Sequence, residues 1–225
     1  MAKKKKEGVV NEGGLYLEPL LTRPKKVAIV ALGLSSKEFV MEAVGNMSTA
    51  LRHPFDEVWT LNRGLKAFPH DKLFCMDDFR WLEQRDTGYA QFLKEHDKPV
   101  ITSTAYPEYP NAVEYPIDDV GTWLGDDIFC VNTVAYMVAY ALSIGVTDLW
   151  LYGADFAYPD GNKAESGGQA VTYLLGYGAA KYGLKHYIPS TSTLLYANKL
   201  EQTPGGPPRR IRYGYHRKAQ VKDTK

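Results

Sequence analysis

Short apolar runs alternate with stretches of helical periodicity along most of this sequence, and that alternation constrains the fold more than any other feature. The first run, Val27 to Ala31, has no polar interruption, which is typical of a strand covered on both faces of a parallel sheet. The run is followed by Gly33, and Ser35 stands three residues before Glu38, the spacing of a capping box that opens a helix. We therefore expect a strand, a tight turn and a helix in this segment.

The same unit recurs as far as residue 188. A loop rich in proline and tyrosine is expected over 106–116, with at most a short strand near Val113. Further strands are expected at 58–61, 73–76, 99–102, 148–153 and 185–188, and helices over 78–95, from Asn132 or Thr133 to Gly145, and over 166–182. Repeated strand–helix units predict an α/β fold with a single, doubly wound, mainly parallel sheet of the Rossmann type.

The 225 residues suffice for one sizeable core, which we place at 25–200. The segments 1–24 and 201–225 are interpreted as flexible basic tails, which either only solubilise the protein or contact phosphates. The formal net charge of +1 gives the whole chain no attraction for nucleic acid or membranes. The two cysteines lack any paired spacing, and no apolar run approaches the roughly 18 residues of a membrane span, so we expect a cytoplasmic protein. Its oligomeric state is left open.

In an open parallel sheet, ligands bind beyond the carboxyl ends of the strands. We call this edge of the sheet the rim. The start of the helix at Asn132 belongs to it and offers free N–H groups to a phosphate. The candidate binding residues are those that follow the strands or open this helix: Gly33, Ser35, Asn62, Arg63, Asp77, Asp78, Ser103, Thr104, Asn132, Thr133, Gly153, Asp155 and Phe156. Neither G-x-G-x-x-G nor a P-loop motif occurs, which argues against a nicotinamide enzyme and a P-loop kinase. A purely structural interpretation stays open: Gly33 only turns the chain and Ser35 only caps a helix.

Three carboxylates of this rim are candidates for catalysis. Either Asp77 or Asp78 could serve as a general base or metal ligand while the other caps the next helix, or both could be caps. Asp155 could accept hydrogen bonds from sugar hydroxyls, or could simply form a turn. The five histidines show no metal-binding spacing, so no metal-ligand set is assigned among them.

The segment 132–137, the apolar helix behind it and the segment 144–156 resemble the central stretch of bacterial sialyltransferases of the Campylobacter type. Three further segments look like parts of that family. Residues 27–36, V-A-I-V-A-L-G-L-S-S, resemble its G-x-G-P-S turn, and residues 59–63, W-T-L-N-R, resemble its strand-end Asn. Residues 188–195 are similar to its S-P-x-S-x-L ending. In that family a polar helix start and a G-x-D-F segment contact the cytidine nucleotide of the donor. The resemblance implies a nucleotide pocket built from Gly33, Ser35, Asn62, Asn132, Thr133, Gly153 and Asp155.

This scaffold is shared with MptE-like pterin pyrophosphokinases and with motility-associated glycosyltransferase-like proteins. Residues 26–196 also resemble small tailed-phage proteins labelled norphogenetic, through M-D-D-x-R, T-S-x-x-x-P-x-Y-P and Y-G-x-D-F-x-Y-P. The first turn lacks the sialyltransferase proline, the helix starts with Asn132 and Thr133 instead of Ser-Gly, and no position matches the family's catalytic histidine.

These observations predict a glycosyltransferase-like protein that binds a CMP- or UDP-type nucleotide-sugar, with Asp77, Asp78 or Asp155 deprotonating the acceptor. For a phage protein the acceptor is expected to be a hydroxymethylated base in DNA, with the basic tails on the phosphate backbone. One alternative is phosphoryl or pyrophosphoryl transfer with Mg²⁺ held by Asp77 and Asp78. Another is a non-catalytic protein that sequesters a nucleotide.

Overall fold

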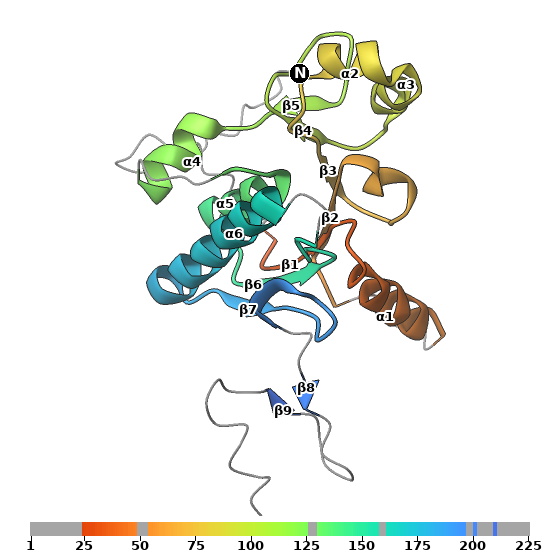
Figure 1. The fold of residues 1–225 in the computed structure, drawn as a ribbon. Coiled ribbons are helices and arrows are strands. Elements are labelled where there is room, and N and C mark those ends of the chain that lie inside the picture. Colours follow the sequence, from red (N-terminus) through yellow and green to blue (C-terminus); the bar gives the residue numbers. More distant parts are fainter. Residues whose placement is uncertain are drawn as a thin grey trace, which may run out of the picture.

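Seven parallel strands form the central sheet of this computed structural model, in the order β5-β4-β3-β2-β1-β6-β7 (Figure 1). The structure describes residues 24–48, 54–125, 130–157, 161–196, 200–201 and 209–210. The strands are β1 (Lys26–Val30), β2 (Glu57–Leu61), β3 (Lys72–Phe74), β4 (Val100–Thr102), β5 (Ala112–Glu114), β6 (Asp148–Tyr152) and β7 (Lys185–Tyr187). The predicted Rossmann-like, doubly wound sheet is confirmed.

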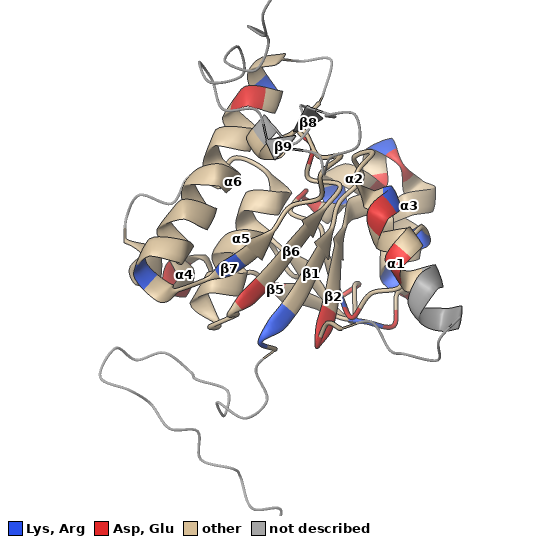
Figure 2. Cartoon of the chain, turned by 90° about the horizontal axis from the view of Figure 1, so that it is seen from below, with Lys and Arg blue, Asp and Glu red and all other residues tan. Residues whose placement is uncertain are grey.

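Helices cover both faces of this sheet, and Figures 1 and 2 show α4, α5 and α6 on one face and α1, α2 and α3 on the other. The helices are α1 (Ser36–Ser48), α2 (Phe79–Arg85), α3 (Thr87–Glu95), α4 (Ile117–Leu124), α5 (Thr133–Ser143) and α6 (Gly161–Tyr182), with short 3₁₀ turns at η1 (Asn62–Lys66) and η2 (Leu194–Tyr196). Within the described residues, no helix is both long and apolar enough to cross a membrane.

The apolar run of β1 is buried from both sides because its side chains alternate between the two layers. Val27 and Ile29 join the cluster formed with α5 and α6, whereas Ala28 and Val30 pack with Phe39 of α1. Helix α5 contains no charged residue and buries seven of its side chains, which fits its position between the sheet and α6 (Figure 2). The continuous apolar pattern thus correctly predicted a central strand.

The strand order changes direction at β1: β2 to β5 follow on one side of it, whereas β6, its parallel neighbour with Tyr152 opposite Val30, lies on the other side. The chain leaves β1 toward α1 on one face and leaves β6 toward α6 on the other face. Diverging connections of this kind open a crevice at the carboxyl ends of the two strands. The fold therefore makes this edge the place to look for a site.

Some expectations were wrong in detail. The helix expected over 78–95 is divided into α2 and α3, because the Asp86 side chain accepts the backbone N–H of Tyr89 and starts a second helix. Helix α4 was not predicted, and α6 begins at Gly161, earlier than expected. Nearly all of the segments interpreted as basic tails, 1–24 and 201–225, lie outside the described residues; β8 (Leu200–Glu201) and β9 (Arg209–Arg210) form a small antiparallel pair.

A histidine pair lies before β3 and β4, at the end of the sheet opposite the crevice. The two Nε2 atoms of His70 and His96 are 3.2 Å apart, and Nδ1 of His70 is 2.8 Å from the carbonyl oxygen of Phe68. A carbonyl only accepts, so His70 carries its proton on Nδ1 and its Nε2 accepts the N–H of His96. Burial lowers the pKa of both imidazoles below their usual 6.5. The pair is therefore neutral in the folded protein.

We expect stability to fall as the pH drops below about 6.5, because the unfolded chain then binds protons that the folded pair resists. The contribution of the pair is fully present above that pH and is lost as pH falls through the lower, folded pKa values. Urea unfolding across this range should show a flatter pH dependence in His96→Gln. The control is the same substitution at the exposed His186, which should leave the pH dependence of wild type unchanged. An identical pH dependence in His96→Gln and wild type would refute the prediction.

Candidate functional site

A cavity of about 530 Å³ lies at the crevice between β1 and β6. Its walls come from the turn after β1, the end of β2, the start of α5, the segment after β6 and the segment before η2. The lining residues are Ala31, Leu32, Gly33, Leu34, Leu61, Asn62, Val134, Gly153, Ala154, Asp155, Phe156, Ala157, Thr191 and Thr193. The volume is in the range of small-molecule and cofactor sites.

Ser35 and Asp155 join the two sides of the crevice. The backbone N–H of Ser35 donates to Oδ2 of Asp155 (2.8 Å), and its hydroxyl donates to Oδ1 (2.5 Å). The hydroxyl oxygen in turn accepts the backbone N–H of Gly153 at 2.8 Å. Ser35 is fully buried and Asp155 nearly so. Both carboxylate oxygens are thus occupied in holding the turn after β1 against the segment after β6.

The prediction of a capping box at the start of α1 was wrong, because the Ser35 side chain has another partner. The Ser35 side chain is committed to Asp155 rather than to the backbone of Glu38. The Glu38 carboxylate accepts from the backbone N–H and hydroxyl of Thr191, at 3.2 and 2.5 Å. A pattern that reads as local capping instead connects α1 to the segment before η2.

Two glycines permit the close approach of β1 and β6. The N–H of Gly33 donates to the carbonyl of Gly153 at 2.9 Å. A Cβ at Gly33 would lie 2.5 Å from that carbonyl oxygen and 2.5 Å from Oδ2 of Asp155. Gly153 has φ of +69°, and a Cβ there would lie 2.3 Å from the carbonyl oxygen of Ala31. Both positions require glycine because other atoms already occupy the space of a side chain.

Asn62, directly after β2, lines this cavity and carries an unsatisfied polar atom. Its Oδ1 is buried and has no hydrogen-bond partner within the described residues. Its backbone φ is +48°, a conformation that asparagine tolerates better than most residues. Buried carbonyl oxygens are normally paired, so one that is left open at a cavity marks a place for a ligand donor.

The helix start predicted at Asn132 is confirmed. Oδ1 of Asn132 accepts the N–H of Ala135 at 3.0 Å, and Nδ2 donates to the carbonyl of Gly167 at 3.3 Å. Asn132 and Thr133 do not line the cavity, but Val134 does, so the first turn of α5 reaches it. The first N–H groups of a helix have no partner inside it and carry partial positive charge.

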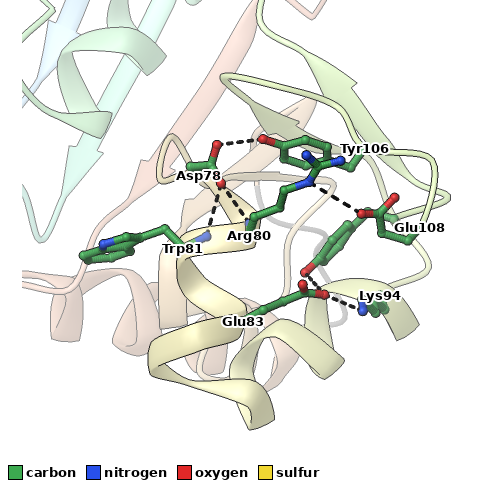
Figure 3. A network of polar contacts seen from close by, with 8 residues as sticks. Asp78, Arg80, Trp81, Glu83, Lys94, Tyr106 and Glu108 are labelled. Carbon is green, nitrogen blue, oxygen red and sulfur yellow. Dashed lines mark hydrogen bonds and ion pairs between the residues drawn. The ribbon is translucent and has the colours of Figure 1, made fainter.

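Asp77, Asp78 and Ser103 do not line this cavity. Asp78 caps α2, as one of the sequence interpretations expected: its Oδ1 accepts the N–H groups of Arg80 and Trp81 at 2.8 and 3.2 Å. Its Oδ2 accepts the hydroxyl of Tyr106 at 2.7 Å (Figure 3). The Tyr106 hydroxyl and these backbone donors hold the pKa of Asp78 below its usual value. Asp77 and Ser103 are exposed.

Five of the predicted residues, Gly33, Asn62, Gly153, Asp155 and Phe156, come together around the cavity, and Ser35 supports it from behind. The candidate residues did not include Thr191 and Thr193, although the resemblance of 188–195 to the S-P-x-S-x-L ending of the sialyltransferases was a signal for this segment. Among the described residues, no group of three or more His, Cys, Asp or Glu side chains is arranged to hold a metal ion.

Comparison of the fold identifies bacterial sialyltransferases as similar structures. The sialyltransferase CstII from Campylobacter jejuni, in complex with CMP-3FNeuAc, is 18% identical with a TM-score of 0.50, over 77% of this chain and 83% of that chain. An α-2,3-sialyltransferase from Campylobacter jejuni is 14% identical with a TM-score of 0.45, over 86% and 82%. No family model matches this chain, and no curated protein matches its sequence. The likeness to CstII shows the scaffold that the sequence resemblance implied.

Proposed function

We propose that this chain binds a nucleotide-sugar donor, of the cytidine type, in the cavity between β1 and β6 and belongs functionally to the glycosyltransferases. The observation that carries this proposal is the unpaired, buried Oδ1 of Asn62, a residue that lines the cavity. A buried acceptor needs an N–H or O–H donor, and nucleobases and sugars offer both. The start of α5 at the same cavity suits the phosphate of the nucleotide.

The choice of cytidine is supported by the similar structure with a bound ligand. CstII has the same fold and was determined with CMP-3FNeuAc, a substrate analogue. A ligand at the switch point of a doubly wound sheet is also the general expectation for this architecture. A first experiment is a thermal-shift comparison of CMP, UMP, GMP and AMP. CMP should give the largest stabilisation.

Removing the Asn62 side chain provides a direct test. Asn62→Gly keeps the positive φ accessible and deletes an unsatisfied carbonyl, so the free energy of unfolding should change by less than about 1 kcal/mol. CMP affinity measured by calorimetry should fall about tenfold, the loss of roughly 1.4 kcal/mol from one hydrogen bond.

Asn111→Ala is the matched control, because the Asn111 side chain donates to the carbonyl of His96 away from the cavity. It should reduce stability and leave CMP affinity unchanged. An Asn62→Gly protein that binds CMP as tightly as wild type would count against the proposed site.

The geometry also favours a second candidate, nucleotide binding without transfer. Asp155 is the one carboxylate among the lining residues described for this cavity, and both of its oxygens accept from Ser35. Its role as the acceptor's base stays a prediction, as do those of Asp77 and Asp78. Release of CMP from CMP-sialic acid, followed by chromatography, separates the candidates: a transferase or hydrolase releases CMP, whereas a sequestering protein retains intact donor.

Two narrower expectations remain predictions. Transfer to a hydroxymethylated DNA base depends on the basic tails, nearly all of which lie outside the described residues. The Mg²⁺-dependent alternative depends on Asp77 and Asp78, and Asp78 is already engaged with Tyr106 and the start of α2. Undiminished activity in EDTA would rule out that alternative.

A further inference from the structure

A groove of about 610 Å³ lies beside the cavity and shares Asp155, Phe156 and Thr193 with it. The rest of its lining comes from one face of α6 and from the segment around η2. These residues are Ala164, Glu165, Gly168, Gln169, Thr172, Leu194 and Leu195. The groove therefore adjoins the proposed donor site.

Phe156 is fixed in this position by its backbone and by α6. Its φ is +50°, which is uncommon for a bulky residue. A Cβ at Gly167 would lie 2.8 Å from Cδ1 and Cε1 of the ring, so the helix can accept the ring because that position is glycine. Leu195, which also lines the groove, has φ of +60°. Strained conformations of this kind cluster where a chain holds a ligand.

The polar side of the groove is a row of three side chains at helical spacing on α6. Nε2 of Gln169 donates to Oε1 of Glu165 at 3.2 Å, and the hydroxyl of Thr172 donates to the carbonyl of Gly168 at 2.7 Å. These bonds use one of the two N–H donors of Gln169 and the single O–H donor of Thr172, and they leave carboxylate, amide and hydroxyl oxygens that can accept. The row is therefore suited to ligand hydroxyl groups.

The charge of the groove argues against a phosphate-rich ligand. Asp155 and Glu165 are the charged residues in its described lining, and both are acidic. Asp155 is shared with the donor cavity, but Glu165 lines only the groove and would repel a second nucleotide or a nucleic-acid backbone. Phe156, Leu194 and Leu195 add apolar surface to the groove, which suits the C–H face of a sugar ring.

We propose that this groove is the acceptor subsite and binds a neutral pyranoside through Glu165 and Gln169. The inference rests on the proposed function of the neighbouring cavity. In the transfer, the acceptor hydroxyl oxygen bonds to the anomeric carbon of the donor while the bond from that carbon to the phosphate oxygen breaks. The phosphate leaves with the bonding electron pair, and the hydroxyl proton goes to water.

The test is saturation-transfer NMR of the full chain with the methyl β-glycosides of galactose, glucose and N-acetylglucosamine, with and without CMP. Glu165→Ala/Gln169→Ala should reduce glycoside binding at least fivefold and leave CMP affinity unchanged. Gln91→Ala/Glu95→Ala is the matched control, because Nε2 of Gln91 donates to Oε1 of Glu95 in the same way on α3 (2.6 Å). This control should alter neither binding.

The outcomes separate the two proposals. Failure of all three glycosides to bind, or binding that survives Glu165→Ala/Gln169→Ala, overturns the groove assignment even when CMP binds normally. Glycoside binding that depends on these two residues, without any CMP binding, supports the groove as a sugar site and overturns the donor proposal. Methyl β-glucuronide binding as tightly as the glucoside overturns the argument from charge.

Discussion

Gly153→Ala is expected to destabilise the protein by about 3–5 kcal/mol, a large share of the 5–15 kcal/mol typical of a domain. The alanine would have to adopt φ of +69°, and its Cβ would lie 2.3 Å from the carbonyl oxygen of Ala31. Backbone atoms cause this clash, so no side-chain rotation relieves it. Relief requires β1 and β6 to separate at their carboxyl ends. That separation would also break the hydrogen bond that the backbone N–H of Gly153 donates to the hydroxyl oxygen of Ser35. Urea unfolding monitored by circular dichroism measures the effect.

Gly176→Ala is the matched control. Gly176 lies in α6, and a Cβ there would meet nothing within 4 Å. Alanine should stabilise this helix by roughly 0.5–1 kcal/mol. A Gly153→Ala protein within 1 kcal/mol of wild type would show that the contact between β1 and β6 is not as tight as described.

The parts of the fold that could be predicted are those that depend on local pattern. The run 27–31 has to be a strand with two buried faces, and Asn132 before an apolar helix has to be a cap, because neighbouring residues determine both outcomes. The mainly parallel, doubly wound sheet, and a site at its carboxyl edge, then followed from repeated strand–helix units.

The partners of polar side chains could not be predicted in the same way. Ser35 has the spacing of a local cap, yet its hydroxyl bonds to Asp155, which is 120 residues away in the sequence. Asp78 follows a strand just as Asp155 does, but only Asp155 lines the cavity. Which carboxylate reaches the crevice depends on strand order and register, and these are properties of the assembled sheet.

The break at Asp86 is a different kind of error, because a local signal was present. Asp86-Thr87-Gly88 is a cap sequence inside an otherwise helical pattern, and the Asp86 side chain does accept the N–H of Tyr89. The apolar periodicity of 78–95 outweighed that signal in the sequence interpretation. By contrast, the positive φ of Phe156 had no sequence signal, since a bulky residue is uncommon in that conformation.

Separating Ser35 from Asp155 is the second large effect that we expect. Asp155→Ala leaves the N–H and the hydroxyl of a fully buried serine without their acceptors, which should cost about 3–4 kcal/mol. Ser35→Ala should cost about 2 kcal/mol, because Gly153 N–H and one carboxylate oxygen each lose a partner.

The double variant should be more stable than the sum of the two losses predicts, by a coupling energy of about 1–3 kcal/mol, because each single change already breaks the bond between the two side chains. Asp148→Asn, at the opposite end of β6, should change stability by less than about 0.5 kcal/mol, because its bond to the Thr147 hydroxyl is exposed to solvent. Urea unfolding of the four proteins of the cycle gives the coupling directly. Strictly additive losses would mean that the two side chains stabilise the crevice independently, and would contradict the bond between them.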